Sequence, residues 1–421
     1  MTLYVCRVQI QSSLAAFAAV LGDGSIANWG VADVGGDSRA VREKLKNALG
    51  IRATRYAFAA LLGDGSVVSW GGAGHGGDST AVQDQLKNVQ QIQASAQAFA
   101  AIIGNGSVVS WGDGRCGGDS RAVQHQLNNV QQIQASGSAF AAILRDGSVV
   151  SWGGADYGGD SSAVQAQLKN VQQIQATSHA FAAILADGSV VTWGADQFGG
   201  DSSAVQDQLK NVQQVQANDH AFAAILGNGS VVTWGDAHHG GDSSAVQEQL
   251  RNVQQIQASY SAFAALLGDG SVLTWGASEH GGRSGAVHHQ LKNVQQIQAC
   301  HRAFAAILGD GSVATWGDAD SGGDSSAVQH QLKKVQQIQA SVCAFAAVLA
   351  DGSVVTWGDA ERGGDSSAVQ GQLNNVQQIQ ASFASFAAIR GNGSVVTWGH
   401  ADCGGDSSAV QDQLRSSASW S

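Results

Sequence analysis

The sequence predicts a mainly β protein built from ten tandem repeats, each with three short strands and a short helix. The first observation is a period: a tryptophan recurs every 41 residues, and a phenylalanine precedes each one by twelve residues. The second is an Asp-Gly or Asn-Gly pair between two apolar runs in every repeat. Fixed periods of 20–50 residues are typical of solenoids, propellers and other repeat arrays. The tryptophans of the array are Trp29, Trp70, Trp111, Trp152, Trp193, Trp234, Trp275, Trp316, Trp357 and Trp398.

The repeats extend over residues 1–421 without a visible linker, so we expect a single repeat array. Residues 1–45 form a degenerate N-terminal repeat, and residues 415–421 form a C-terminal tail outside the period. Such divergence is expected at the ends, because terminal repeats have a special capping role.

A hairpin is the best-defined local element of each repeat. In one representative repeat, strands are predicted at 89–94, 98–103 and 107–111. Asn105-Gly106, between the last two, suits the positive φ angles of a two-residue type I′ turn. Seven repeats have Asp at this turn and three have Asn, which indicates a shared backbone role. We therefore interpret Asn-Gly-Ser as a turn and not as a glycosylation site.

A two-residue turn also predicts the register of the hairpin. With the turn at 64–65, Leu62 lies opposite Val67, and Ala59 lies opposite Trp70. Both faces of this hairpin are then apolar. A hairpin that is apolar on both sides must be covered on both sides, and stacked hairpins achieve this as the blades of a propeller do.

A short helix is predicted after the Gly-Gly step of each repeat, for example over residues 119–127. In another repeat Asp160 is a candidate N-cap, and Ser162 with Gln165 matches a capping box. Apolar residues follow at i, i+4 and i+7. A helix of two or three turns is not stable alone, so its apolar stripe must dock on the sheets.

Two architectures are compatible with these βββα repeats. The first is a β-propeller-like toroid, or an open spiral of blades if ten repeats do not close. The alternative is an α/β solenoid with one continuous sheet. The propeller predicts that strands pair mostly within a repeat, whereas the solenoid predicts pairing between neighbouring repeats.

Composition excludes several classes of function. The net charge is −11, which argues against nucleic acid and anionic membranes as partners, because phosphate binding rests on Lys and Arg. No apolar run is long enough for a membrane-spanning helix. Five cysteines without a CxxC pair favour neither a disulfide framework nor a zinc site. We expect a monomer in the cytoplasm, with the nucleus as a second possibility.

No catalytic constellation is recognisable, so we expect no enzyme activity, no cofactor and no metal. The chain has neither a GxxxxGK[ST] nor a GxSxG motif. Catalysis requires a fixed set of nucleophile, base and orienting group. His238, His239 and His280 could approach one another from adjacent repeats, but we interpret them as surface residues.

The repeats differ from one another mainly at two places, a pair before the second strand and a pair after Trp-Gly, and also at one position of the predicted helix, such as Asp84 or His125. Radical exchanges at these places argue against a tightly packed environment and predict exposed loops. Either the positions drift after recent duplication, or they form a diversified recognition surface, and the two hypotheses predict different clustering. The candidate partner-binding residues are Arg55, Tyr56, His179, His220, Tyr260, Arg302, Phe383, Arg115, Tyr157, Phe198, His239, His280 and Arg362.

The string from Phe181 to Gly194, followed by Phe198-Gly199-Gly200, resembles the regulator of chromosome condensation repeat. That family joins a strand, an Asp-Gly turn, a strand ending in Trp-Gly and an aromatic-Gly step. The resemblance implies a β-propeller-like scaffold. Members of that family include a guanine-nucleotide exchange factor for a small GTPase and large ubiquitin ligases that use such propellers as docking domains.

The sequence thus predicts a non-catalytic repeat scaffold that binds a protein partner through its variable loops. One alternative is a substrate-docking module of a ubiquitin ligase or a guanine-nucleotide exchange factor for a small GTPase. Another is a structural repeat array without a specific partner.

Overall fold

The computed structural model describes residues 9–416, with side chains through residue 414. The C-terminal tail predicted at 415–421 therefore lies almost wholly outside the described residues. The chain divides into two compact units. Unit 1 contains 1–104, 109–113 and 336–421, and unit 2 contains 105–108 and 114–335.

Residues 9–416 form ten three-stranded antiparallel sheets, each made of consecutive strands in chain order. We number the repeats by these sheets. Repeats 1–3 contain β1 (Gln9–Ser12), β2 (Ala16–Val20), β3 (Ile26–Gly30), β4 (Ala48–Ala53), β5 (Ala57–Leu62), β6 (Val67–Gly71), β7 (Val89–Ala94), β8 (Ala98–Ile103) and β9 (Val108–Gly112). Repeats 4–8 contain β10 (Val130–Ala135), β11 (Ala139–Leu144), β12 (Val149–Gly153), β13 (Val171–Ala176), β14 (Ala180–Leu185), β15 (Val190–Gly194), β16 (Val212–Ala217), β17 (Ala221–Leu226), β18 (Val231–Gly235), β19 (Val253–Ala258), β20 (Ala262–Leu267), β21 (Val272–Gly276), β22 (Val294–Ala299), β23 (Ala303–Leu308) and β24 (Val313–Gly317). Repeats 9 and 10 contain β25 (Val335–Ala340), β26 (Ala344–Leu349), β27 (Val354–Gly358), β28 (Val376–Ala381), β29 (Ser385–Arg390) and β30 (Val395–Gly399).

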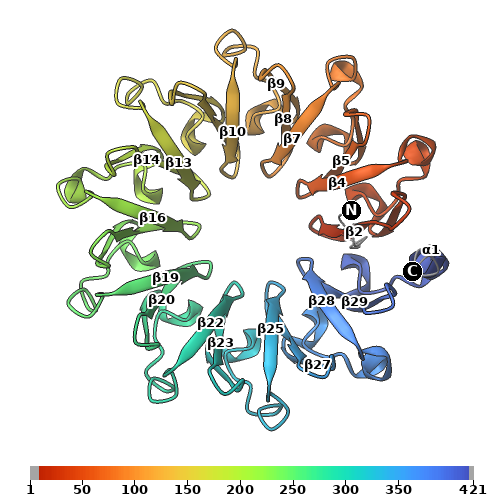
Figure 1. Ribbon diagram of the computed structural model, residues 1–421, viewed down its shortest axis with the longest axis vertical. Helices are drawn as coiled ribbons and strands as arrows, with labels where there is room; N and C mark the ends of the chain where they lie inside the picture. Colours follow the sequence, from red (N-terminus) through yellow and green to blue (C-terminus); the bar gives the residue numbers. More distant parts are fainter. Residues whose placement is uncertain (1–8, 417–421) are drawn as a thin grey trace, which may run out of the picture. The chain divides into compact units, whose positions relative to one another are not determined.

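This strand pairing confirms the predicted fold class of ten repeats with propeller-like blades. Every sheet is confined to one repeat, so the alternative of a continuous solenoid sheet is wrong. Within unit 2, the first strands β10, β13, β16, β19 and β22 follow one another in neighbouring sheets (Figure 1).

The predicted helix of each repeat is mostly replaced by turns and short 3-10 segments. Residues 119–127 contain turns without a regular helix, and the one α-helix among residues 9–416 is α1 (Gln411–Ser416). The 3-10 segments are η1 (Ala32–Val34), η2 (Arg39–Lys44), η3 (Ala73–His75), η4 (Thr80–Val82), η5 (Gly114–Cys116), η6 (Ala155–Tyr157), η7 (Asp196–Phe198), η8 (Ser203–Val205), η9 (Ala237–His239), η10 (Ser278–His280), η11 (Ala319–Ser321), η12 (Ala360–Arg362), η13 (Ser367–Gln372), η14 (Ala401–Cys403) and η15 (Ser408–Val410).

The predicted capping box is also wrong. The Gln165 side chain does not pair with Ser162; its Oε1 accepts from Ser161 Oγ at 3.1 Å, and its Nε2 donates to the Val149 carbonyl at 2.9 Å. The Asp160 carboxylate accepts from the Ser162 amide two residues on, which is an Asx turn. The segment therefore uses its polar side chains to bind the neighbouring strand and to form turns.

The hairpin turn has three residues, and the predicted register is wrong by one position. Phe58 lies opposite Trp70, and Leu61 lies opposite Val67. Gly65 has a φ of 80°, whereas Asp64 is absent from the residues with positive φ. This pattern is that of a type I turn followed by a left-handed glycine, which makes a bulge. The Asp64 carboxylate accepts from the amide and hydroxyl of Ser66, which explains why Asn can replace Asp.

The core lies between neighbouring sheets, as the doubly apolar hairpin predicts. In unit 2, Phe222 and Trp234 stack with 5.2 Å between ring centroids. They pack on Ala180 and Ala182 of the preceding repeat. The Trp234 indole donates to the Gly199 carbonyl of that repeat at 3.1 Å. The ten repeating tryptophans are only 3–4% exposed, and within each unit neighbouring repeats complete one another's cores.

The first and last repeats, both in unit 1, contact each other in the same manner (Figure 1). The Trp29 indole donates to the Gly404 carbonyl at 3.0 Å. Phe17 and Trp29 share one buried cluster with Ile389 and Val395. The degenerate N-terminal repeat therefore keeps the contacts that the other repeats make.

Candidate functional site

Both variable places of each repeat lie at the same end of its sheet. The first is the loop that leads into the middle strand, and the second is the 3-10 segment that follows the last strand. In repeat 4, for example, Ala139 at the start of β11 pairs with Gly153 at the end of β12. The Asp-Gly turn lies at the other end of the same two strands. We call the two ends the loop end and the turn end.

Hydrogen bonds hold the two variable places together within one repeat. In repeat 5, the Thr177 hydroxyl donates to the Phe198 carbonyl at 3.0 Å and accepts from the Ala180 amide. This connects the loop that bears His179 to the 3-10 segment that bears Phe198. Other repeats have Ser, Asn or Cys at the Thr177 position, as in Cys300, whose Sγ donates to the Ser321 carbonyl.

Glycine fixes the end of each of these 3-10 segments. Gly199 has a φ of 90°, and a Cβ there would lie 2.6 Å from the Phe222 ring of the next repeat. A residue with a side chain would be strained at this φ and would also displace the buried phenylalanine. The aromatic-Gly step therefore places the side chain of Phe198 at the loop end, while Gly199 lies against the buried Phe222 ring.

Backbone hydrogen bonds also connect the loops of adjacent repeats in unit 2. The Gly137 amide donates to the Ser178 carbonyl at 2.9 Å, and the Ser178 amide donates to the Asp219 carbonyl at 3.2 Å. The Tyr260 amide donates to the His301 carbonyl at 3.1 Å. These bonds do not depend on side-chain identity, so they set a fixed spacing for whatever side chains the loops bear.

Ring side chains from repeats 4–6 stack on one another at this end. Tyr157 and His179 have centroids 4.2 Å apart, His179 and Phe198 are 4.1 Å apart, and Phe198 and His220 are 5.3 Å apart. The angles between these ring planes are 23–28°. Stacked rings of this kind stabilise a structure by more than the burial of their apolar surface alone provides.

The stack continues through repeats 6–8. His239 lies 4.3 Å from His220, and Tyr260 meets His220 edge to face at 5.1 Å. Tyr260 in turn contacts His280 at 6.0 Å and His301 at 5.3 Å. We call the whole set the ring row: Tyr157, His179, Phe198, His220, His239, Tyr260, His280 and His301.

A cavity of about 460 Å³ opens beside the first three rings of the row. Its walls include the exposed carboxylate of Asp156 and the side chain of Gln197. The remaining lining comes from Ala155, Tyr157, His179, Gly194, Ala195 and Phe198. Such a combination of ring surface and one carboxylate suits a ligand group that is both flat and cationic.

Burial favours the neutral form of three imidazoles of the row. Desolvation lowers the pKa of His179, His220 and His280 below the usual range, and in each case it is the largest cause. The Asp236 carboxylate lies 3.0 Å from His239 Nδ1 and accepts from the His238 amide. His179, His220 and His280 therefore contribute ring surface with a weakened tendency to become positively charged.

The predicted residues in unit 1 form two smaller contacts. Tyr56 lies 4.7 Å from His75, measured between ring centroids. The Arg362 guanidinium lies 5.4 Å from the centroid of Phe383, and its Nε lies 3.3 Å from the Asp359 carboxylate. Arg55 is exposed in the loop beside Tyr56.

Two predicted residues of unit 2 lie outside the row. Arg115 is exposed in η5. Arg302 is exposed beside His301, and its Nη1 lies 3.8 Å from the Asp318 carboxylate. Of the thirteen predicted residues, the structure brings seven into the row: Tyr157, His179, Phe198, His220, His239, Tyr260 and His280.

Sequence reasoning missed His75, His301 and the carboxylates that accompany the rings. His75 and His301 occupy variable positions, so that pattern could have found them. The expectation that all variable positions are loosely packed is wrong, because Cys116, Val342 and Ala384 are only 4–7% exposed. Arg115, Tyr260 and Arg302, which also occupy variable positions, are exposed.

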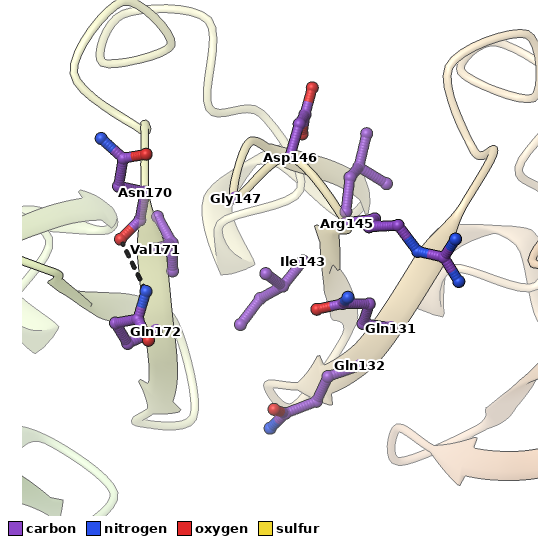
Figure 2. Close-up of a pocket in the computed structure, with 10 residues that line it drawn as sticks. Gln131, Gln132, Ile143, Arg145, Asp146, Gly147, Asn170, Val171 and Gln172 are labelled. Carbon is purple, nitrogen blue, oxygen red and sulfur yellow. Dashed lines mark hydrogen bonds between the residues drawn. The ribbon is translucent and has the colours of Figure 1, made fainter.

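Two further cavities lie within single units. One of about 660 Å³ lies in unit 1 between the first and last repeats, beside Trp29, Arg42 and Asp402. The other, of about 300 Å³, lies at the turn end in unit 2 between β10 and β13 (Figure 2). Gln131, Gln132 and Gln172 line it, and Gln172 Nε2 donates to the Asn170 carbonyl at 3.4 Å.

The described residues contain no cluster of three or more His, Cys, Asp or Glu that is arranged to hold a metal ion. Between residues 9 and 416, the cysteines form no disulfide, and Cys6 lies outside this range. No helical segment in that range has the length and hydrophobicity that a membrane crossing requires.

No protein-family model and no curated protein matches this chain. Among solved structures, Prp20p from Saccharomyces cerevisiae is 17% identical over 65% of this chain and 82% of its own, with a TM-score of 0.37. The computationally designed protein Ika8 is 13% identical over 73% of this chain and 94% of its own, with a TM-score of 0.33. The ectodomain of the Arabidopsis thaliana receptor kinase ACR4 is 15% identical over 62% and 93%, with a TM-score of 0.34.

Prp20p is the yeast RCC1, so these structures include a protein of the family that the repeat motif resembles. At such identities and TM-scores the likeness carries no argument about activity or partner. The fold described above rests on the strand pairing of this chain itself.

Proposed function

We propose that this chain is a non-catalytic repeat scaffold that binds a protein partner, and that the ring row of unit 2 is its binding surface. The observation that carries the proposal is the meeting of eight ring side chains from five consecutive repeats at positions that vary elsewhere in the array. A rigid backbone supports them, because the loops are bonded to one another through main-chain atoms.

The physical properties of the row are those of a protein interface. Tyrosine and other large rings present much contact area at a low cost in conformational entropy and are enriched among binding hot spots. Tyr260 is 37% exposed, and Phe198 and His179 are half-buried beside a cavity. The backbone amides of Tyr157, Phe198 and Tyr260 are already hydrogen-bonded within the chain, so a partner would meet mainly side chains there.

Affinity capture from cell extract with a matched pair of double variants tests this function. Tyr157→Ala with Phe198→Ala removes two rings from the row, and Tyr56→Ala with His75→Ala removes the ring pair of unit 1. We expect the row variant to lose its partner by about tenfold or more, since hot-spot truncations cost upwards of 1.4 kcal/mol. The control variant should retain it, with the far-ultraviolet circular dichroism of both variants unchanged.

Equal capture by both variants would contradict the proposal. Failure of the wild-type chain to retain any protein would favour the structural array without a specific partner. Tyr157 and Phe198 are partly buried at the edge of the cores between the sheets, so the circular dichroism spectra are needed to show that the fold is retained.

A further inference from the structure

The chemical class of the partner can be inferred from the charges around the ring row; this step rests on the function proposed above. In each of repeats 4–8, the 3-10 segment or the residue before it bears a carboxylate. So does one of the loops. These acidic residues are Asp156, Asp196, Asp219, Asp236, Glu279, Asp318 and Asp320.

Little positive charge balances these carboxylates. The imidazoles of the row have a pKa lowered by burial at three of their positions. The Arg302 guanidinium lies 3.8 Å from the Asp318 carboxylate, at the end of the row. At pH 7, the loop end of repeats 4–8 therefore combines ring surface with a net negative charge.

The chain itself contains an example of what such a surface binds. In unit 1, the guanidinium of Arg362 lies over the Phe383 ring while its Nε approaches the Asp359 carboxylate. Arg362 ends η12, the position that Tyr157 and Phe198 occupy in η6 and η7. Repeat 9 has an arginine at the end of its 3-10 segment, next to a ring and a carboxylate. Repeats 4–7 have rings and carboxylates too, but Tyr157, Phe198, His239 and His280 stand at the position of that arginine.

We propose that the ring row accepts an arginine-bearing segment of a partner protein, with one guanidinium in the cavity bounded by Asp156, Tyr157 and Phe198. The guanidinium is planar, stacks on rings and pairs with a carboxylate through two parallel N–H groups. Lysine offers a point charge without this flat surface, so arginine is preferred. The repeated carboxylates favour a segment with several arginines, one after another along the row.

The test uses the purified full chain and short fluorescent peptides of defined sequence. One peptide alternates Arg and Gly, a second alternates Lys and Gly, and a third alternates Glu and Gly. We expect fluorescence anisotropy to give an order of affinity of Arg over Lys, with no binding of the Glu peptide. The affinity should fall as salt is added, because exposed charge pairs are screened.

Two single substitutions at equivalent positions provide the matched comparison. Asp156→Asn removes the carboxylate beside the cavity, whereas Asp33→Asn makes the same change in η1 of repeat 1, outside the row. We expect Asp156→Asn to weaken binding of the Arg peptide about fivefold to tenfold, as a charge-assisted hydrogen bond is worth more than a neutral one. Phe198→Leu should also weaken it, and Asp33→Asn should not.

Several outcomes would overturn the inference. They are equal affinity for the Arg and Glu peptides, equal effects of Asp156→Asn and Asp33→Asn, or no binding of the Arg peptide. Sedimentation that shows self-association lost in Phe198→Leu would assign the row to a second copy of this chain instead. If the partner captured from extract depends on the row but the Arg peptide does not displace it, the inference fails and the proposed function stands.

Discussion

The two ends of each sheet tolerate different residues, although the same two strands connect them. At the turn end, the Gly188 carbonyl accepts from the Val212 amide of the next repeat at 2.9 Å, and a Cβ on Gly188 would lie 2.8 Å from Asn211 Cα. Main chain touches main chain there, so few residues fit. At the loop end, backbone bonds also join the repeats, but the side chains extend away from them.

This difference explains where the repeats vary. Asp or Asn, then Gly and Ser, recur at every turn because φ and hydrogen bonding require them. Loop-end residues such as His179 and Ser138 occupy the same backbone position with unlike side chains. A repeat array can therefore change its surface at one end without altering the contacts that hold its sheets together.

Of the substitutions that test this comparison, we expect the one at the turn-end glycine to lower the free energy of unfolding most. Gly188→Ala introduces a side chain at a φ of 77° and against the backbone of Asn211. Strain at such a position costs about 1–3 kcal/mol, before the displacement of the neighbouring chain is added. Urea unfolding should show this loss. Gly371→Ala is the control, because a Cβ there meets nothing within 4 Å, and it should be neutral or slightly stabilising.

A smaller, opposite effect is expected at Lys334. Asn occupies the equivalent left-handed position in eight other repeats, including Asn211 and Asn293, and Lys334 has a φ of 56°. Asn tolerates this conformation better than Lys, so Lys334→Asn should stabilise the chain by about 1 kcal/mol. A higher thermal midpoint would confirm it. Lys333→Asn, one residue earlier and without a positive φ, should not raise the midpoint.

The smallest effect is expected from the pH dependence of the row. Because burial lowers the pKa of His179, His220 and His280 in the folded chain, the unfolded chain binds more protons below about pH 6.5. Stability should therefore decrease as the pH falls from 7.5 to 5. Repulsion from His239, His179 and His280 lowers the pKa of His220 further, whereas attraction to the Asp236 carboxylate raises it.

Thermal midpoints of wild type and His220→Phe across this pH range provide the measurement. The phenylalanine keeps a ring in the row but cannot be protonated, so its midpoint should fall less in acid. A parallel decrease in both proteins would show that the imidazoles of the row do not control the acid response. His238→Phe is the control, since His238 is exposed beside the row.

Much of the fold was predictable from local signals. The period gave the number of repeats, and the doubly apolar hairpin required a neighbour on each face, as the 3–4% exposure of the repeating tryptophans confirms. The register was not predictable, because it depends on whether both Asp64 and Gly65 have a positive φ, as in a type I′ turn, or Gly65 alone, as observed. The predicted helix did not form as a regular helix. The Gln165 side chain, expected to cap it, donates instead to the Val149 carbonyl of β12.

The sequence by itself determined the ten repeats, their antiparallel hairpins and the positions free to vary, because these depend on spacing and on the conformational limits of Gly, Asp and Asn. Only the tertiary structure decided which variable side chains meet. His179 joins Tyr157 of the preceding repeat and Phe198 of its own, since the distance between loops is set by backbone bonds between repeats. Contacts between loop side chains of different repeats have no local signal, so the ring row and its carboxylates appear only when the sheets are packed.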